Sequence, residues 1–283
     1  MRLRYYLTEV FRDESENVSR AKGISEDQAR QLLKTHCKDS VQDYIQGNYL
    51  GRGTKDTTDF TYIDPTQHVR KSAYVGSNYY NLILSNHKSW SKYPRRDQSL
   101  VCHVGQSQSN YGTPYIVLPF DGSRIGICPA QDIWLSFMKT WKQTLDLVSN
   151  DLGITLKEFT GRNVIVASWP ELESAITETA DILQARFTNG VYDDESGEYI
   201  KGYQDERLVG LMRGFHSVAH GRFDQWLYKL FSPAANKFKL TKAGNLPSSA
   251  SRPEAWTDGK SVLISIGNKY QMSIVDDMVD SIT

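Results

Sequence analysis

The chain has 283 residues, of which 39% are hydrophobic, so it can bury a sizeable core in one elaborated domain or two small ones. Lys and Arg number 33 and Asp and Glu also number 33, which excludes a whole-molecule attraction to nucleic acid or to an anionic membrane. Any polyanion would have to be bound by a local basic site.

Cysteine usage and hydropathy exclude further classes. Cys37, Cys102 and Cys128 are odd in number, widely separated and without metal-ligand spacing, so we expect neither a disulfide framework nor a zinc knuckle. No apolar run reaches about eighteen residues, and the start lacks the apolar stretch of a secretory signal. The expectation is a cytoplasmic protein with reduced thiols and no membrane partner.

The first segment, residues 1–45, is expected to be helical. Ser25-Glu26-Asp27-Gln28 has the pattern of a capping box, and Ala29, Leu32 and Leu33 then recur on one helical face. This helix should pack on the core that follows.

A strand-rich centre is predicted next. Glycines, threonines and aromatic residues between 44 and 65 are typical of strands and turns, which puts Arg52 on a strand or at its exit. Residues 78–90 have the pattern of a short amphipathic helix, and Pro94 then ends helical geometry. Two buried strands are predicted after it, over 99–104 and 115–120.

The remaining chain changes character twice. Apolar residues recur with helical spacing over about 131–235, which predicts a helical insertion. A polar stretch then leads to Glu254, and a final strand is predicted over 259–267. We therefore predict an α+β chain with an N-terminal helical segment, 1–45, and a domain over 46–283 that carries the insertion.

Three distant segments supply an arginine, a serine and a glutamate beside predicted strands. An arginine between glycines can hold a diphosphate, because its planar fork donates several hydrogen bonds and glycine lets the backbone approach closely. A short hydroxyl side chain can position a ribose, and a carboxylate can stabilise the oxocarbenium-like sugar that forms when an N-glycosidic bond to nicotinamide breaks. The segments are Tyr49-Leu50-Gly51-Arg52-Gly53, Arg95-Arg96-Asp97-Gln98-Ser99-Leu100-Val101-Cys102 and Arg252-Pro253-Glu254-Ala255-Trp256.

This pattern resembles the Arg–Ser–Glu class of ADP-ribosyltransferases over residues 45–130 and 250–275. The resemblance implies a split antiparallel β-sheet with a cleft for NAD, the substrate, between its halves. It implies that Arg52 binds the NAD phosphates together with Gly53, that Ser99 positions the nicotinamide ribose, and that Glu254 is the catalytic carboxylate. Further candidates for NAD binding are Arg70, Tyr80 and Arg96.

The two later motifs depart from the family pattern. The family has Ser-Thr-Ser where this chain has Ser99-Leu100-Val101, and Glu-x-Glu or Gln-x-Glu where it has Arg252-Pro253-Glu254. Arg252 stands where arginine-modifying members place a second acidic or amide side chain, which engages the acceptor guanidinium. The acceptor therefore stays open: we expect a host protein, with nucleic acid as the alternative.

A second resemblance lies near the start of the chain. Leu7-Thr8-Glu9 is similar to the Leu-x-Glu cleavage sites in head-targeting peptides of large tailed phages, some of whose ADP-ribosyltransferases are packaged in the capsid. This similarity implies a protein packaged in a virion, but we favour an ordinary amphipathic first helix for these residues. The alternative function is that of a non-enzymatic phage head-interior or host-interaction protein with a degenerate transferase fold.

Two histidine patterns carry less weight. His216 and His220 are spaced by one helical turn, but the Glu that a zinc protease needs between them is absent, so we expect no metal site. Cys102 and His103 are neighbours on a predicted strand, where successive side chains point to opposite faces. That alternation argues against a thiolate–imidazole pair.

Overall fold

The computed structural model describes residues 21–55, 58–67, 79–105, 112–138, 168–174, 177, 231–248, 250–266 and 269–280. Residues 7–9, Arg70 and most of the expected insertion at 131–235 lie outside these ranges. The chain divides into two compact units, one formed by 1–73, 84–136 and 237–283, the other by 74–83 and 137–236. The sheet and the candidate site belong to the first unit.

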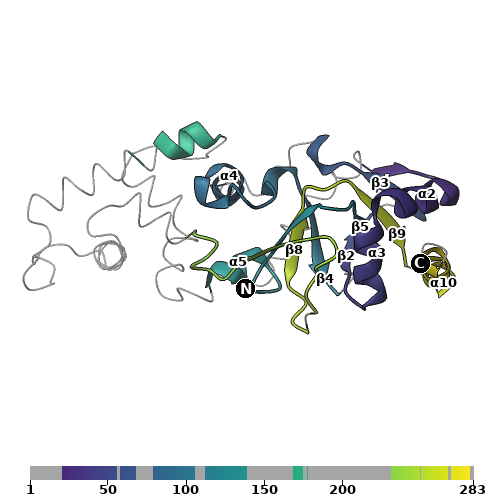
Figure 1. Cartoon of the computed structure of the whole chain (residues 1–283). Helices are drawn as coiled ribbons and strands as arrows, with labels where there is room; N and C mark the ends of the chain where they lie inside the picture. The colour runs from purple at the N-terminus through teal and green to yellow at the C-terminus, as the bar shows by residue number, and fades with distance from the viewer. Residues whose placement is uncertain are drawn as a thin grey trace, which may run out of the picture. The chain divides into compact units, whose positions relative to one another are not determined.

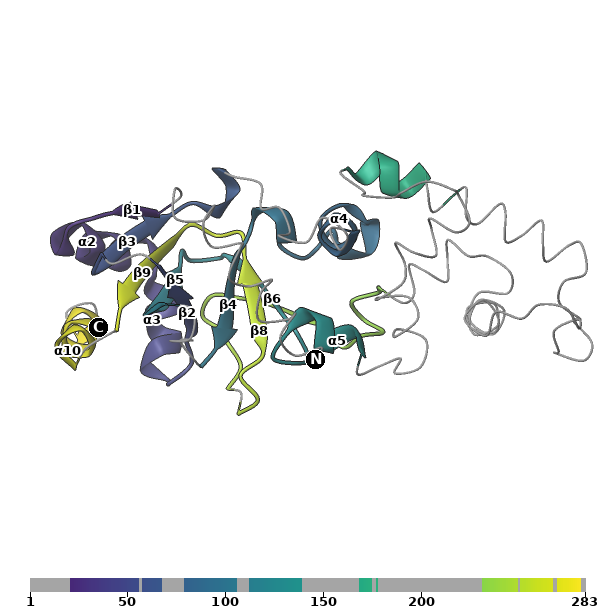
Figure 2. The same cartoon turned by 180° about the vertical axis from the view of Figure 1, so that it is seen from behind.

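The first unit is built on one nine-stranded sheet in which every neighbouring pair of strands is antiparallel (Figures 1 and 2). Its order is β1-β3-β9-β5-β2-β4-β8-β6-β7. The α+β prediction is therefore confirmed. The strands are β1 (Ala21–Gly23), β2 (Leu50–Thr54), β3 (Phe60–Ile63), β4 (Leu100–Val104), β5 (Thr113–Pro119), β6 (Arg124–Ile127), β7 (Lys239–Lys242), β8 (Glu254–Thr257) and β9 (Ser261–Ser265).

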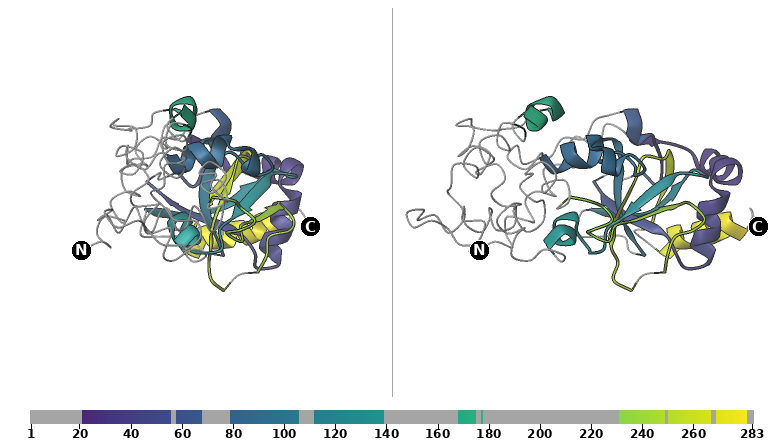
Figure 3. Two further views of the ribbon diagram at one scale, coloured as in Figure 1. Left: turned by 90° about the vertical axis from the view of Figure 1, so that its left-hand side faces the viewer. Right: turned by 60° about the vertical axis from the view of Figure 1, so that its left-hand side comes forward.

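Three helices cover one face of the sheet near β5 and β9: α2 (Glu26–His36), α3 (Lys38–Ile45) and α10 (Lys269–Asp280). The capping box that starts α2 is confirmed, since Ser25 and Gln28 exchange side-chain to backbone hydrogen bonds of 3.2 and 3.0 Å. Figure 3 shows α10 beside α3, where the Tyr44 hydroxyl donates to Asp276. Their buried core joins Ala29, Leu33, Cys37, Val41, Ile116, Leu118, Val262, Ile264, Val275, Met278 and Val279.

A second core lies on the other face of the strands. Alternate residues of β2, β4 and β8 point into it, among them Leu50, Cys102 and Ala255. Tyr115 of β5 and Ile127 of β6 join them, so the core extends across both halves of the sheet. Because successive side chains on a strand alternate between its two faces, the residues that lie between these core residues project to the opposite face.

Several element bounds differ from the prediction. The segment 1–45 contains a strand, β1, as well as helices. The helix expected over 78–90 is α4 (Tyr79–Asn86), and it ends because His87 adopts an extended backbone and caps the 3-10 helix η4 (Lys88–Trp90). Glu254 does not merely precede the last strand but begins a strand of its own, β8. The other short helices are η2 (Pro65–Gln67), η5 (Arg96–Gln98) and α5 (Ile133–Met138).

Trp256 of β8 is completely buried in an aromatic cluster with Trp90, Tyr93 and Phe238, whose ring centroids lie 6.1 to 6.3 Å from its own. Its indole N–H donates to the carbonyl of Pro94 at 2.9 Å. This cluster holds the segment that contains η4 and η5 against β8.

Gly126 makes room for that indole, since a Cβ built there would lie 2.4 Å from the Trp256 ring. We predict that Gly126→Ala lowers the free energy of unfolding by about 1–3 kcal/mol, because the ring is held by its hydrogen bond and packing and cannot retreat. Denaturant unfolding would measure this. Gly23→Ala is the control: its Cβ meets only the Thr58 side chain at 3.3 Å, and a change as large as that of Gly126→Ala would contradict the explanation.

Candidate functional site

The three segments singled out in the sequence lie on consecutive strands of the sheet, in the order β2, β4, β8. Gly51 pairs directly with His103, and His103 pairs directly with Glu254. Because directly paired residues project to the same face, His103 and Glu254 share a face, and β2 contributes no side chain beside them at Gly51. This row of three residues is the centre of the candidate site.

Arg52 lies at the seam between β2 and β4. The ladder between these strands pairs only Leu50 with Val104 and Gly51 with His103, although both strands are fully described and continue further. Beyond the last pair, the Arg52 guanidinium donates from Nη1 to the carbonyl oxygen of Val101 at 2.7 Å. A side chain thus replaces a backbone bond where the two strands separate.

Arg52 and Glu254 start from opposite faces. Arg52 follows Gly51 and pairs with Tyr115, which belongs to the second core, whereas Glu254 precedes Ala255 of that same core. The guanidinium reaches the seam only because the side chain is long. The structure therefore places these two residues on strands that are separated by β4 alone, and it does not make them face each other.

Ser99 is 4% exposed and comes just before β4. Its hydroxyl donates to the carbonyl of Arg95, which closes the turn around η5. In this arrangement the hydroxyl stabilises the entry to the strand.

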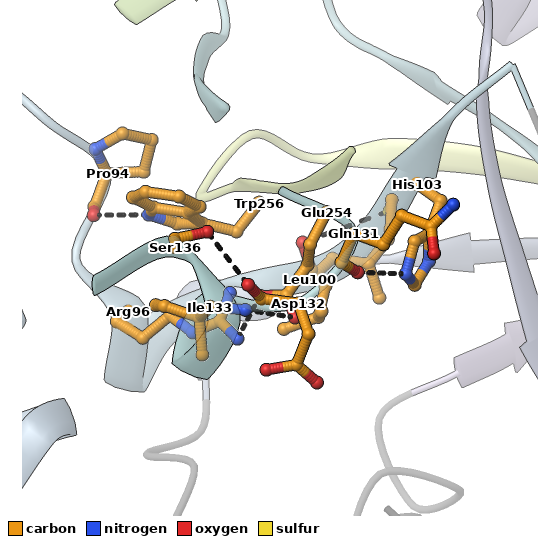
Figure 4. A network of polar contacts seen from close by, with 12 residues as sticks. Pro94, Arg96, Leu100, His103, Gln131, Asp132, Ile133, Ser136, Glu254 and Trp256 are labelled. Atoms are coloured by element: carbon orange, nitrogen blue, oxygen red, sulfur yellow. Dashed lines mark hydrogen bonds and ion pairs between the residues drawn. The ribbon is translucent and has the colours of Figure 1, made fainter. Parts of the chain in front are cut away.

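Glu254 is 6% exposed and its carboxylate is fully engaged (Figure 4). Oε1 lies 2.5 Å from Nη2 of Arg96, and Oε2 accepts from the backbone N–H of Ile133, in the first turn of α5, at 3.3 Å. Arg96 is itself buried, and its guanidinium lies over the Trp256 ring at 5.4 Å. Its Nη1 is a buried donor without a hydrogen-bond partner.

The other predicted site residues fall in different places. Gly53 is buried in β2, where it pairs with Pro114 of β5. Tyr80 lies on α4, in the second unit, and Arg70 lies outside the described residues. Of the additional candidates, Arg96 is thus the one seen in contact with Glu254.

His103 is the residue that sequence reasoning set aside. It does point away from Cys102, as the strand alternation predicted: Cys102 is buried in the second core, and the Nε2 atom of His103 lies 3.1 Å from the carbonyl oxygen of Gln131. Burial lowers the pKa of His103, and Arg96 and Arg52 act in the same direction, while Glu254 and the hydrogen bond to the Gln131 carbonyl oppose the shift. The alternation of side chains on β4 could be predicted from the sequence. The neighbour of His103 could not, because it is set by the pairing of β4 with β8.

The cysteines near the site are not reactive. Burial raises the pKa of Cys102 to about 12 and that of Cys128 well above its ordinary value. Both thiols therefore stay protonated near neutral pH and are poor nucleophiles.

Comparison of the chain with protein-family models, with curated proteins and with solved structures gives no significant match. Within the ranges that the structure describes, no three His, Cys, Asp or Glu side chains gather to hold a metal ion. In the same ranges, no helix is long and apolar enough to cross a membrane. Functional assignment rests on the site itself.

We predict that Arg96→Met lowers the free energy of unfolding by about 3–5 kcal/mol, because it leaves the Glu254 carboxylate buried without its cation. The matched control is Arg95→Met: Arg95 has a 48% exposed side chain paired with Asp97, and its loss should cost about 1 kcal/mol or less. Chemical denaturation of both variants measures the difference. Equal losses would show that the buried pair contributes no more than a surface pair.

Proposed function

We propose that the chain is an NAD-dependent ADP-ribosyltransferase that transfers ADP-ribose to a host macromolecule and releases nicotinamide. The observation that carries this proposal is the adjacency of β2, β4 and β8 in the sheet. Folding brings the arginine, serine and glutamate segments from distant parts of the chain onto three neighbouring strands. In sequence alone their common order was the only link between them.

The charges around Glu254 suit the chemistry. Departure of nicotinamide leaves positive charge on the ribose, and a carboxylate in a partly desolvated site stabilises such charge more strongly than one in water. Arg96 pairs with Glu254 and orients its carboxylate, and the unpaired Nη1 of Arg96 offers a donor to an oxygen of the bound nucleotide. Arg52, at the seam, is the proposed ligand of the diphosphate.

The seam between β2 and β4 also supports the finer fold assignment. An ADP-ribosyltransferase-like core is a split antiparallel sheet, and a ladder of only two residue pairs between two five-residue strands is the local feature that such a split requires. We place the proposed NAD site along this seam. For catalysis, Glu254 must exchange part of its contact with Arg96 for the nicotinamide ribose.

A second candidate function is that of a non-enzymatic phage head-interior or host-interaction protein with a degenerate transferase fold. The burial of Glu254 in an ion pair favours it, as does the use of the Ser99 hydroxyl to bond the Arg95 carbonyl. The two functions differ in NAD binding. Calorimetric titration with NAD would show binding for the transferase and none for the non-enzymatic protein.

The test of catalysis is Glu254→Gln, which keeps the side-chain shape and removes the charge. We predict that nicotinamide release from NAD falls by about 10²–10³-fold, the typical cost of removing one preorganised electrostatic contact to the transition state. Release would be followed by chromatography. The thermal midpoint must be measured alongside, since Arg96 loses its anion in this variant.

Glu26→Gln serves as the control, because Glu26 forms an exposed pair with Arg30 on α2 and should leave nicotinamide release unchanged. If a folded Glu254→Gln variant released nicotinamide at the wild-type rate, the catalytic assignment of Glu254 would be wrong. If the wild-type protein bound no NAD, the second candidate function would replace the first.

A further inference from the structure

We infer that the acceptor of ADP-ribose is a side-chain carboxylate of a protein, and that Arg252 binds this carboxylate beside Glu254. This inference rests on the proposed transferase function. It names the chemical class of the acceptor group, and it assigns a residue that determines specificity for it.

Arg252 has an unusual backbone conformation. Its φ angle is 48°, in the left-handed region that residues other than Gly, Asn and Asp rarely adopt. It also precedes Pro253, and a residue before proline favours an extended backbone. Strain of this kind persists only where the surrounding structure imposes it, and it gathers at functional sites.

Hydrogen bonds on both sides of the chain fix the backbone that follows Arg252. The carbonyl of Pro253 accepts from the N–H of Val104 at 3.0 Å, and the N–H of Glu254 donates to the carbonyl of Ala130 at 3.0 Å. Pro253 and Glu254 are buried, whereas Arg252 is exposed. The strained residue is therefore the last exposed position before the buried start of β8.

The contacts of Arg252 itself do not account for the strain. Among the residues that the structure describes, no hydrogen-bond or ion-pair partner is found for its guanidinium. Glycine would adopt the same backbone without a steric penalty. An unpaired arginine at a position that favours glycine indicates a role outside the folding of this chain.

The place of Arg252 in the chain suits a role in binding the acceptor. It comes two residues before Glu254, so the Cα atoms of the two residues are at most about 7 Å apart. Its guanidinium is always charged, and its fork of donors matches a carboxylate. The same charge repels the guanidinium of an arginine or the ammonium group of a lysine. A cation here therefore selects an anionic acceptor.

The charge distribution favours a protein carboxylate over the phosphate of a nucleic acid. Binding to a nucleic acid draws on several cations along the phosphate backbone. The whole chain has 33 basic and 33 acidic residues, and the charge of Arg96 is already paired with Glu254. Arg252 supplies one exposed cation at this point, which is sufficient for one carboxylate.

Transfer to a carboxylate requires no base, because Asp and Glu side chains are ionised at neutral pH. Glu254, whose two oxygens are engaged by Arg96 and by the N–H of Ile133, does not have to take a proton. The bond between C1′ of the ribose and the nicotinamide nitrogen breaks, and its electron pair leaves with neutral nicotinamide. A lone pair of the acceptor carboxylate forms the new C1′–O bond. The product is an ester of ADP-ribose.

The test compares the wild-type protein with Arg252→Gly, using labelled NAD and a terminally blocked peptide whose only ionisable group is one glutamate. The wild-type protein should label this peptide and not its glutamine counterpart, and neutral hydroxylamine, which cleaves esters, should release the label. In Arg252→Gly the ratio of peptide labelling to NAD hydrolysis should fall by about 10- to 100-fold, as expected for the loss of a hydrogen bond to a charged group. The thermal midpoint should not fall, because glycine relieves the strain.

Lys237→Gly is the matched control. Lys237 is also exposed and has a φ angle of 61°, but it precedes β7 at the edge of the sheet. It should keep the wild-type ratio.

Three results would overturn the inference while leaving the transferase function standing. They are an unchanged ratio in folded Arg252→Gly, no more label on the glutamate peptide than on its glutamine counterpart, and preferential labelling of a 5′-phosphorylated oligonucleotide. Absence of nicotinamide release from the wild-type protein would instead overturn both.

Discussion

The buried ion pair between Arg96 and Glu254 is the constraint around which this part of the molecule is organised. Two opposite charges with side chains 5% and 8% exposed lie 2.5 Å apart. Desolvating them is costly, and the cost is offset only if each is well placed. The α5 backbone at Ile133 and the ring of Trp256 supply the remaining contacts, which ties η5, α5 and β8 together. These contacts hold the Glu254 carboxylate in one position in the structure.

Arg52 lies beside the shorter of the two ladders that β4 forms. The β4 strand makes four residue pairs with β8 and only two with β2. Where β2 and β4 part, the Arg52 guanidinium closes the gap by bonding the Val101 carbonyl. Beyond the last residue pair, β2 and β4 can separate when the hydrogen bond from Arg52 to Val101 is lost. If the ladder continued, several backbone hydrogen bonds would have to break. This is a suitable place for a phosphate group to replace a carbonyl as the partner of the arginine.

Local patterns predicted much of the fold. The capping box at Ser25, the strands around Arg52 and the strand after Ser99 followed from turn residues and alternation, which act over a few residues. The strand that begins at Glu254 was missed because a polar, proline-containing stretch leads into it, and its strand character depends on pairing with β4 and β6. Pairing between distant segments leaves no local signal.

The site could be predicted only in part, for the same reason. The residue types at 52, 99 and 254 were the basis of the predicted chemistry, which stays a prediction, and the sheet order places their segments on or beside consecutive strands. The partner of Glu254 was not evident, because Arg96 resembled a solvated residue after a proline. Nor was the position of His103 beside Glu254, since the pairing of β4 with β8 joins segments that are far apart in the sequence.

The most direct test of this account is a crystal structure of the wild-type protein with NAD. The account predicts that NAD lies along the seam of β2 and β4, with its diphosphate on Arg52 and its nicotinamide ribose within hydrogen-bonding distance of Glu254. The contact between Arg96 and Glu254 should be partly exchanged for contacts to the ligand. NAD bound elsewhere would contradict it, and so would NAD that makes no contact with His103 or Glu254 at a saturating concentration.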